Sequence, residues 1–469
     1  MHLLNSIKSY RSEFWLINAL QFVEKLAYTS MLWQMPIYIA QKNIEGGLQW
    51  GQEIKGTIFL VWAIVQNITP IFTGGLPIKF GYKKVFIFAF VLIFFGYMGL
   101  ATQKEIIPFT ISVLIIGVGS GILVPTIQGS LASIMNYKNQ ASGWGIYFML
   151  INISVLIGGI LSKYIKNLGW EILFLFSAIM TLLNLIIILI LFKNKIHNTT
   201  YNLKNIFTDG LMILKEKPVL AKFLFFMAGF TIVYMQFYET LPNFIVDWTD
   251  SSSIVFSFSL PEFMLMDTPL GKMLSYEWLL NINSILIILF VVFISSYVFP
   301  QKNIKSIIVG IILASIGLII CSSTMLGSVL VIGIIIYTFG EMLVNPRFHK
   351  FFAIVSPLEY KSIYMSFIKI SFAIGLGLGG ILGGIVYKHL GEKASLAQAY
   401  LLDKFNLDTS INDSFLKLQE LLKLDALSAT KLLWDYYHPY VVFYPFAIIG
   451  LLSVIGLFSI RKKIFQNNN

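Results

Sequence analysis

Charged residues and cysteine are scarce in this sequence. Asp, Glu, Lys and Arg together make up 12% of its 469 residues, whereas about 25% is usual in soluble domains. A water-soluble globular protein of this length is therefore excluded. The single cysteine, Cys321, lies within an apolar run, so disulfide bonds cannot provide a framework for the fold.

Sequence signals for catalysis are also absent. The five histidines fall near the ends of apolar runs or between them, without the spacing of metal ligands, and no Gly-x-x-x-x-Gly-Lys phosphate loop occurs. We therefore expect neither an enzyme nor an ATP-driven pump, and we expect no metal and no cofactor. The alternating segments of about ten residues that are typical of a transmembrane barrel are missing too, which leaves helical spans.

Long apolar runs are what the sequence has instead. Hydrophobic residues make up 57% of the chain, the mean hydropathy is +0.78, and many runs approach the roughly 20 residues that a membrane-spanning helix needs. We predict an all-α membrane protein with about twelve transmembrane helices. The predicted spans are residues 14–40, 53–74, 85–103, 108–131, 142–164, 171–192, 219–246, 277–298, 304–322, 327–350, 363–388 and 438–460.

Lysine and arginine are concentrated in alternate loops. The expected loops on the side of the two termini are basic, and Arg347, Lys350 and Lys361 are assigned to one of them, whereas the loops on the opposite side are mixed or acidic. By the positive-inside rule, both termini are expected in the cytoplasm, with the chain in the inner membrane. These loops explain the net charge of +11, so the expected partners are membrane lipid and a small molecule, without nucleic acid.

Two halves of the chain resemble each other. Gln21-x-x-Glu24 is matched by Gln236-x-x-Glu239 six spans later, and similar pairs relate spans four and ten and spans five and eleven. A six-plus-six duplication follows, with a substrate site near the midplane between the halves. We expect a first six-helix bundle over residues 1–195, a cytoplasmic linker over 196–217 and a second six-helix bundle over 218–469, in a protein that acts as a monomer.

Two long segments are expected on the side opposite the termini. Residues 247–276 combine a serine run with alternating apolar residues, which indicates a hairpin or a short helix. Residues 392–437 contain leucines at near-helical spacing, which predicts one or two amphipathic helices lying on the membrane surface or on the bundle mouth.

A loop between spans two and three resembles the signature loop of the major facilitator superfamily. The stretch Gly74-Gly75-Leu76-Pro77-Ile78-Lys79-Phe80-Gly81-Tyr82-Lys83-Lys84 is similar to the pattern Gly-x-Leu-x-Asp-Arg-x-Gly-Arg-Lys. The resemblance implies the two-bundle fold of that family and a gating loop. The gating residues would be Gly75, Lys79, Gly81, Lys83 and Lys84. Ile78 replaces the family's aspartate, so the charge latch made by that aspartate is not expected here.

Three further stretches resemble the proton-dependent oligopeptide transporter branch of that superfamily. Glu24-Lys25-Leu26-Ala27-Tyr28 is similar to its first-helix motif, Tyr147–Ser154 to its fifth-helix motif, and Gly340–Pro346 to its tenth-helix motif. The resemblance implies that Asn152 holds a peptide carboxylate, Glu341 holds its amino group, and Glu24 and Lys25 carry the proton. Gln21 replaces an upstream glutamate, and Val124 replaces a lysine of the fourth helix, so two ionisable groups of the family's relay are missing.

A polar stripe on the first span is the strongest candidate site from the residues themselves. Gln21, Glu24, Lys25 and Tyr28 lie at i, i+3, i+4 and i+7, on one face of a helix. A carboxylate at membrane depth costs at least about 2.5–3.5 kcal/mol, which favours a functional role. Because adjacent residues point about 100° apart, Glu24 and Lys25 are not expected to pair with each other, and Glu341 is a candidate partner for Lys25.

Other polar residues within spans are candidates for substrate binding, with a structural alternative for each. Glu341 serves proton coupling or substrate binding, or pairs with Lys369 to hold two helices together. Lys369 itself could extend to the membrane surface. The predicted substrate contacts are Gln21, Tyr28, Gln128, Asn152, Gln236, Glu239 and Glu341, and the predicted proton-coupling residues are Glu24, Lys25 and Glu341. Hydrogen bonds between helices are the alternative use of the neutral members.

These features together predict a secondary transporter that works by alternating access. A small organic solute, peptide-like or amino-acid-like, is the expected substrate, with proton coupling through Glu24. An uncoupled facilitator or a drug or metabolite efflux transporter is the alternative that the replaced lysine at Val124 favours. A receptor or scaffold that transports nothing is the other alternative.

Overall fold

The computed structural model describes residues 10–40, 46–137, 139–192, 202, 205–268, 271–299 and 303–466. Helices of membrane-spanning length dominate it, and the predicted all-α membrane fold is confirmed. The long helices are α2 (Ser12–Ala40), α3 (Gln52–Thr73), α5 (Tyr82–Thr102), α6 (Ile106–Ile134), α7 (Gln140–Lys166), α8 (Trp170–Leu191), α10 (Pro218–Glu239), α13 (Tyr276–Tyr297), α14 (Asn303–Ser322), α15 (Gly327–Val355), α16 (Lys361–Leu390) and α20 (Tyr444–Gln466). Among the described residues, eleven segments are apolar enough to cross a membrane, and α2, which carries Glu24 and Lys25, adds a twelfth by its length and position.

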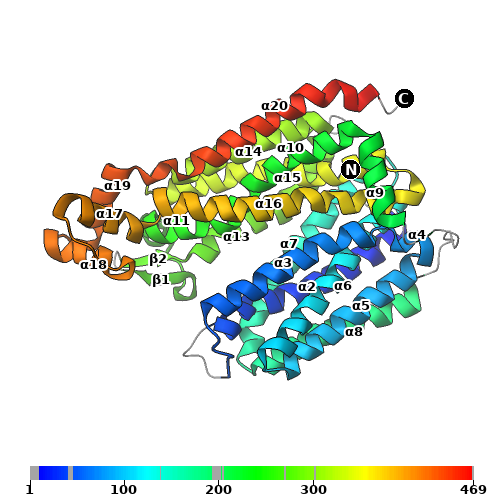
Figure 1. Cartoon of the computed structure of the whole chain (residues 1–469), viewed down its shortest axis with the longest axis horizontal. Coiled ribbons are helices and arrows are strands. Elements are labelled where there is room, and N and C mark those ends of the chain that lie inside the picture. The colour runs from blue at the N-terminus through cyan, green and yellow to red at the C-terminus, as the bar shows by residue number, and fades with distance from the viewer. Residues whose placement is uncertain are drawn as a thin grey trace.

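The helices form two bundles that lie beside each other (Figure 1). Helices α2 to α8 make up the first half and α10 to α16 with α20 the second half. The short helix α9 (Asn205–Glu216) packs against α3 of the first half and against α10 and α16 of the second. The predicted limits of the halves stay a prediction, since residues 193–201 and 203–204 of the expected linker region lie outside the described residues.

Both chain ends lie at the same end of the molecule, which we call the terminal side (Figure 1). The opposite end, which we call the far side, carries the remaining short elements. There, α11 (Leu241–Trp248), α12 (Ser252–Phe258), η1 (Glu262–Met264) and the hairpin of β1 (Leu265–Thr268) and β2 (Gly271–Leu274) follow α10. The sequence predicted a hairpin or a short helix for this segment, and the structure contains both.

Three helices, where one or two were predicted, cover the far side of the second half between α16 and α20. They are α17 (Lys393–Phe405), α18 (Ile411–Leu422) and α19 (Ala426–Tyr437), followed by η3 (Pro439–Phe443). Left-handed residues stop each helix, namely Asn406, Lys423 and His438, with φ between 51° and 54°. The leucine pattern did predict helices here, but it did not show that such turn residues divide the segment into three.

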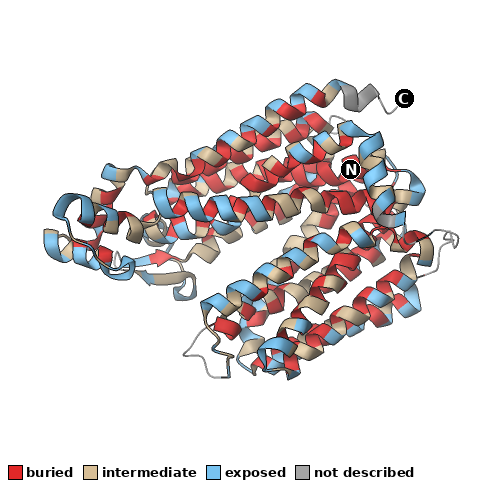
Figure 2. Ribbon diagram, viewed as in Figure 1, coloured by how far each residue is buried: buried red, intermediate tan, exposed pale blue. Residues whose placement is uncertain are grey.

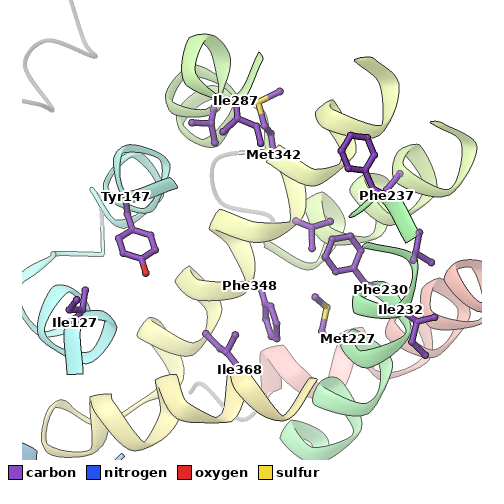
Figure 3. Close-up of a cluster of buried hydrophobic side chains, with 14 of the residues drawn as sticks. Ile127, Tyr147, Met227, Phe230, Ile232, Phe237, Ile287, Met342, Phe348 and Ile368 are labelled. Atoms are coloured by element: carbon purple, nitrogen blue, oxygen red, sulfur yellow. The ribbon is translucent and has the colours of Figure 1, made fainter. Parts of the chain in front are cut away.

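The two halves are in contact at the terminal side and diverge toward the far side (Figure 1). Four helices that meet at the interface show this directly. Each is buried all round over its terminal-side part and exposed on one face elsewhere (Figure 2). The continuously buried runs are residues 125–132 of α6, 140–147 of α7, 340–353 of α15 and 361–368 of α16. Figure 3 shows buried side chains from both halves at this interface, with Ile127 and Tyr147 facing the region of Phe348 and Ile368.

Three cations that we assigned to a terminal-side loop lie inside this enclosed region instead. Arg347, Lys350 and Lys361 are 1%, 2% and 8% exposed. Arg347 donates from Nη2 to the carbonyls of Ser295 and Val298, at 2.6 and 2.8 Å, where α13 ends. The prediction was wrong because α15 continues past its apolar run to Val355, and a helix end supplies free carbonyls that a buried cation can satisfy.

Candidate functional site

The polar stripe of α2 consists of two buried and two half-buried residues. Gln21 and Glu24 are buried, and the Gln21 Nε2 donates to Glu24 Oε2 at 3.3 Å. Lys25 Nζ lies 3.3 Å from the same carboxylate oxygen. The expectation that these neighbours could not pair was therefore wrong. The 100° separation applies to the Cβ directions, and the four-carbon stem of the lysine is long enough for its ammonium to turn back.

Lys25 and Tyr28 extend the stripe toward the far side. The Lys25 ammonium lies 4.6 Å from the centre of the Tyr28 ring, and its side chain is 18% exposed. The Tyr28 hydroxyl donates to Oε1 of Gln66, on α3, at 3.3 Å. The stripe is thus fixed at one end by α3 and carries an ammonium that solvent can reach.

Lys369 of the second half faces this stripe. It is the first residue of α16 after the fully buried run 361–368, and it is half-buried. Its ammonium interacts electrostatically with Lys25 and Glu24 and lies 5.7 Å from the centre of the Phe372 ring. Lys369 therefore does not extend to the membrane surface. Within the described part of the chain, no carboxylate lies within ion-pair distance of it.

Glu341 of α15 occupies a separate pocket of amide groups. It is 5% exposed. Asn283 of α13 donates to its Oε2 at 2.8 Å, and Asn345, one helical turn away, donates to Oε1 at 3.2 Å. Asn283 also donates to the hydroxyl of Thr338. No ion pair reaches Glu341 in the described ranges, so the structure supports neither Lys25 nor Lys369 as its partner.

A hydrogen bond joins the two halves on the terminal side of these charges. Gln128 of α6 lies with Nε2 3.1 Å from Nε2 of His349 on α15, and 3.4 Å from the hydroxyl of Tyr147. The His349 ring also packs against Trp144 and Phe148 of α7. Of this group, the sequence singled out Gln128 as a substrate contact and Tyr147 and Phe148 only as members of the fifth-helix motif, and it did not single out His349 or Trp144. A histidine within an apolar run gives no local signal that its partners lie on another bundle.

The other predicted substrate contacts have diverse surroundings. Gln236 is fully buried and uses both ends of its amide, donating to the carbonyls of Ile232 and Gly379 and accepting from Thr240 at 2.6 Å. It therefore joins α10 to α16 and has no free group for a solute. Asn152 is half-buried and donates to the carbonyl of Phe148 on its own helix. Glu239 is exposed at the far-side end of α10.

The predicted gating loop forms a short helix, α4 (Leu76–Phe80), between α3 and α5 on the terminal side. Gly75 precedes it and Gly81, with φ +79°, ends it, which is a conformation that favours glycine. Lys83 donates to the carbonyl of Leu189 on α8 at 2.9 Å. Lys79 and Lys84 show no hydrogen bond among the described contacts, and Lys79 lies 6.0 Å from the ring centre of Phe80.

An apolar groove of about 560 Å³ lies apart from these groups, between α13, α14 and α15. Its wall has no polar surface, so it cannot hold a charged solute. The lining residues are Phe290, Phe293, Ile294, Val298, Leu313, Ile336, Phe339 and Leu343. Within the described residues, no group of three or more His, Cys, Asp or Glu side chains could hold a metal ion.

Sequence comparisons agree with this architecture. A family model described as Major Facilitator Superfamily matches residues 20–380. The uncharacterized transporter YclF of Bacillus subtilis is 25% identical over 193 residues, which are 39% of this chain and only 38% of that protein. A Na(+), Li(+), K(+)/H(+) antiporter of Planococcus maritimus is 21% identical over 400 residues, covering 74% of this chain and 91% of the antiporter.

Solved structures agree in fold over nearly the whole chain. A POT family transporter in complex with a thioalcohol-conjugated peptide superposes with a TM-score of 0.63 at 15% identity, covering 98% of this chain and 99% of that one. The human organic anion transporter MFSD10 gives a TM-score of 0.62 at 13% identity, with coverages of 95% and 98%. The two values are nearly equal, so the likeness shows the fold and does not separate peptide transporters from other members.

Proposed function

The chain belongs to the major facilitator superfamily and is a multi-pass membrane transporter, not an enzyme, and we propose that it couples the movement of a small zwitterionic solute to protons. Peptides and amino acids are the solute class. The observation that carries this proposal is the separation of charge across the interface. Glu24 and Lys25 lie on the first half, and Glu341 lies on the second half without a cationic partner in the described residues.

Glu341 is suited to hold the ammonium group of the solute. A buried carboxylate is costly unless a proton or a cation accompanies it. Its two oxygens already accept from Asn283 and Asn345, which fix the carboxylate in place, and neither amide carries a charge. A primary ammonium would supply the missing positive charge and several N–H donors.

Glu24 is suited to carry the proton. It is buried, and its Oε2 accepts a hydrogen bond from Gln21 and forms an ion pair with Lys25. Loss or gain of a proton at Glu24 changes the charge at the interface between the halves. Alternating access by rocking of the two halves would then move the site from one side to the other. The conformation described here is enclosed on the terminal side.

The basic loops support a cytoplasmic location for both termini and an inner-membrane location for the chain. The enclosed terminal side would then be the cytoplasmic gate, and the separated far side would face outward. This orientation predicts that a substituted cysteine on β2 or α18 reacts with a membrane-impermeant maleimide applied outside intact cells.

Uptake into proteoliposomes tests the proposal. Labelled alanyl-alanine is added with and without an inward proton gradient, to wild type, Glu24→Gln and Glu171→Gln. The last variant removes a far-side carboxylate that pairs with Lys104 and serves as the control. We expect gradient-driven accumulation in wild type and Glu171→Gln and its loss in Glu24→Gln. Uptake that ignores the gradient would leave an uncoupled facilitator, and no flux in folded protein would overturn the solute class.

Exchange of a monovalent metal cation for protons is a second candidate function. The Oδ1 of Asn345 is buried and has no hydrogen-bond partner among the residues that the structure describes, and it belongs to the side chain that contacts Glu341. Carboxylate, amide and hydroxyl oxygens of Glu341, Asn283, Asn345 and Thr338 are ligands that hard cations prefer, and one relative is named as a cation/proton antiporter. Sodium-driven proton flux in liposomes that Glu341→Gln abolishes would favour this function over the first.

A further inference from the structure

We propose that Lys25 and Lys369 form an anion clamp across the interface of the two halves, and that it takes the carboxylate of the solute. This inference rests on the proposed function for the identity of the solute, and it adds a binding residue, Lys369, that the sequence motifs do not contain. Glu24 is the internal counter-ion of the clamp.

The position of Lys369 on α16 is the first argument. Ser366, three residues earlier, belongs to the face of α16 that meets the first half, because a Cβ placed on Gly74, the residue that follows α3, would lie 3.0 Å from the Ser366 Cβ. Residues at i and i+3 share a helix face. Lys369 therefore points toward the first half, one turn beyond the enclosed run 361–368 and at the point where burial of α16 becomes incomplete.

The charges that meet there are the second argument. The Lys369 ammonium interacts electrostatically with both Lys25 and Glu24, and Lys25 Nζ lies 3.3 Å from Glu24 Oε2. Two ammonium groups and one carboxylate leave one positive charge in excess. The Lys25 side chain is 18% exposed, so an anion can reach its ammonium, and Lys369 lies where burial of α16 becomes incomplete. A single carboxylate bound between them would neutralise the excess and connect one half to the other.

The titratable groups around Glu24 determine how pH changes the charge of this clamp. Titratable side chains on its own helix, on α5, on α7 and on α16 interact electrostatically with Glu24. They are Lys25, Tyr28, Tyr97, Tyr147 and Lys369. All the tyrosines are neutral near pH 7, so Glu24 and the two lysines set the charge. His349 also faces Lys369, and its Nε2 is the atom that meets Gln128.

Protonation of Glu24 raises the excess charge of the clamp from one to two. The affinity for an anion must then rise as pH falls, because each ligand strengthens the binding of the other by the same factor. Proton and solute would therefore bind together, which is what symport requires. In Glu24→Gln the side chain is always neutral, so the part of the pH dependence that comes from Glu24 should be lost.

Binding of N-acetylalanine and of its amide tests the clamp directly. The acetyl group removes the ammonium, so the measurement does not depend on Glu341. The purified full chain is studied by calorimetry and thermal shift at pH 6 and pH 8. We expect the acid to bind at least tenfold more tightly than the amide at pH 6, and its affinity to be lower at pH 8 than at pH 6. The ratio of the two affinities should be smaller in Glu24→Gln than in wild type.

Binding measurements on variants of the two lysines provide the decisive test. Lys25→Gln and Lys369→Gln should each remove at least tenfold of the preference for the acid. Lys369→Arg should retain it, and so should Lys388→Gln, which changes an exposed lysine on the same helix. Size-exclusion profiles and melting temperatures of all variants show whether they fold. Equal binding of acid and amide, including no detectable binding of either at 100 mM, overturns the clamp, and so does a preference that survives Lys369→Gln.

Uptake of alanyl-alanine by the same variants separates this inference from the proposed function. If the acid binds as expected but no peptide is taken up, the clamp stands and the peptide solute is wrong. If peptide uptake is proton-driven but unchanged in Lys369→Gln, the proposed function stands and the clamp is wrong.

Discussion

Gln128 in the first half and His349 in the second half meet Nε2 to Nε2 at 3.1 Å. The other ring nitrogen, Nδ1, lies 3.0 Å from the carbonyl of Asn345. A carbonyl can only accept, so Nδ1 carries the hydrogen, and the bare Nε2 accepts from the amide of Gln128. The neutral imidazole thus fits its surroundings, and it joins α6 to α15 in the enclosed terminal-side region.

Loss of this bond should favour opening of the terminal side. Gln128→Leu keeps the volume of the side chain but removes the donor, and a typical hydrogen bond contributes about 1 kcal/mol. We expect about a fivefold shift in population toward conformations with a longer distance between spin labels at Asn136→Cys and Glu359→Cys, in a Cys321→Ala background. Asn184→Leu is the control, because Asn184 donates to Leu20 within the first half. A similar shift in the control would show that the bond does not act on the interface.

Gly129 allows the backbones of α6 and α16 to approach each other closely on this side. A Cβ at this position would lie 2.7 Å from Cα of Ser362 and 2.9 Å from its backbone nitrogen, and backbone atoms cannot turn aside. Gly129→Ala should therefore separate the halves, with a cost to the enclosed state of about 1–3 kcal/mol. The same spin-label pair should report the shift. Gly384→Ala on α16 meets no atom within 4 Å, and it should leave the distance distribution unchanged.

Apolar periodicity predicted the helices and the stripe of α2, since a membrane leaves helices as the favoured way to satisfy the backbone. It could not distinguish two glutamines in matching motifs. Gln21 has a buried Oε1 with no hydrogen-bond partner in the described part of the chain, whereas Gln236 has both ends of its amide occupied. The difference comes from the helices that pack around each glutamine. The repeated Gln-x-x-Glu motif does not show which helices these are.

The residues that the sequence did not reveal are those whose partners lie far along the chain. His349 and Gln128 are 221 residues apart, and Lys369 faces α2 from the opposite half. An isolated polar residue in an apolar run has the same local pattern whether it faces lipid, another helix or a solute. The Lys25 and Glu24 contact was missed for another reason, because side-chain length outweighed the direction of the Cβ atoms.

Arg347 should be essential for the stability of the second half. Its guanidinium is 1% exposed and satisfies two carbonyls at the end of α13. Arg347→Met leaves both acceptors buried without that donor, at a cost of about 1–3 kcal/mol for each unsatisfied group. We expect a clear loss of melting temperature in detergent. Arg347→Lys should recover part of it, since an ammonium can reach one carbonyl more easily than two. Melting temperatures equal to wild type in both variants would contradict this role.

Asp425 should make the helix α19 sensitive to acid. Its side chain caps the helix by accepting the backbone N–H of Ser428 at 2.7 Å. Hydrogen bonds from the hydroxyl and the backbone N–H of Ser428 lower the pKa of Asp425 from its ordinary value of 3.8. A carboxylate with a lowered pKa in the folded state stabilises the fold above its ordinary pKa, and the effect is lost as pH falls through the lowered value. Hydrogen exchange of the α19 amides should therefore accelerate below about pH 4, after correction for the intrinsic rate. Asp425→Asn should remain capped and lose this pH dependence, because asparagine caps a helix without titrating, so equal acid profiles for the two proteins would argue against the cap as the cause.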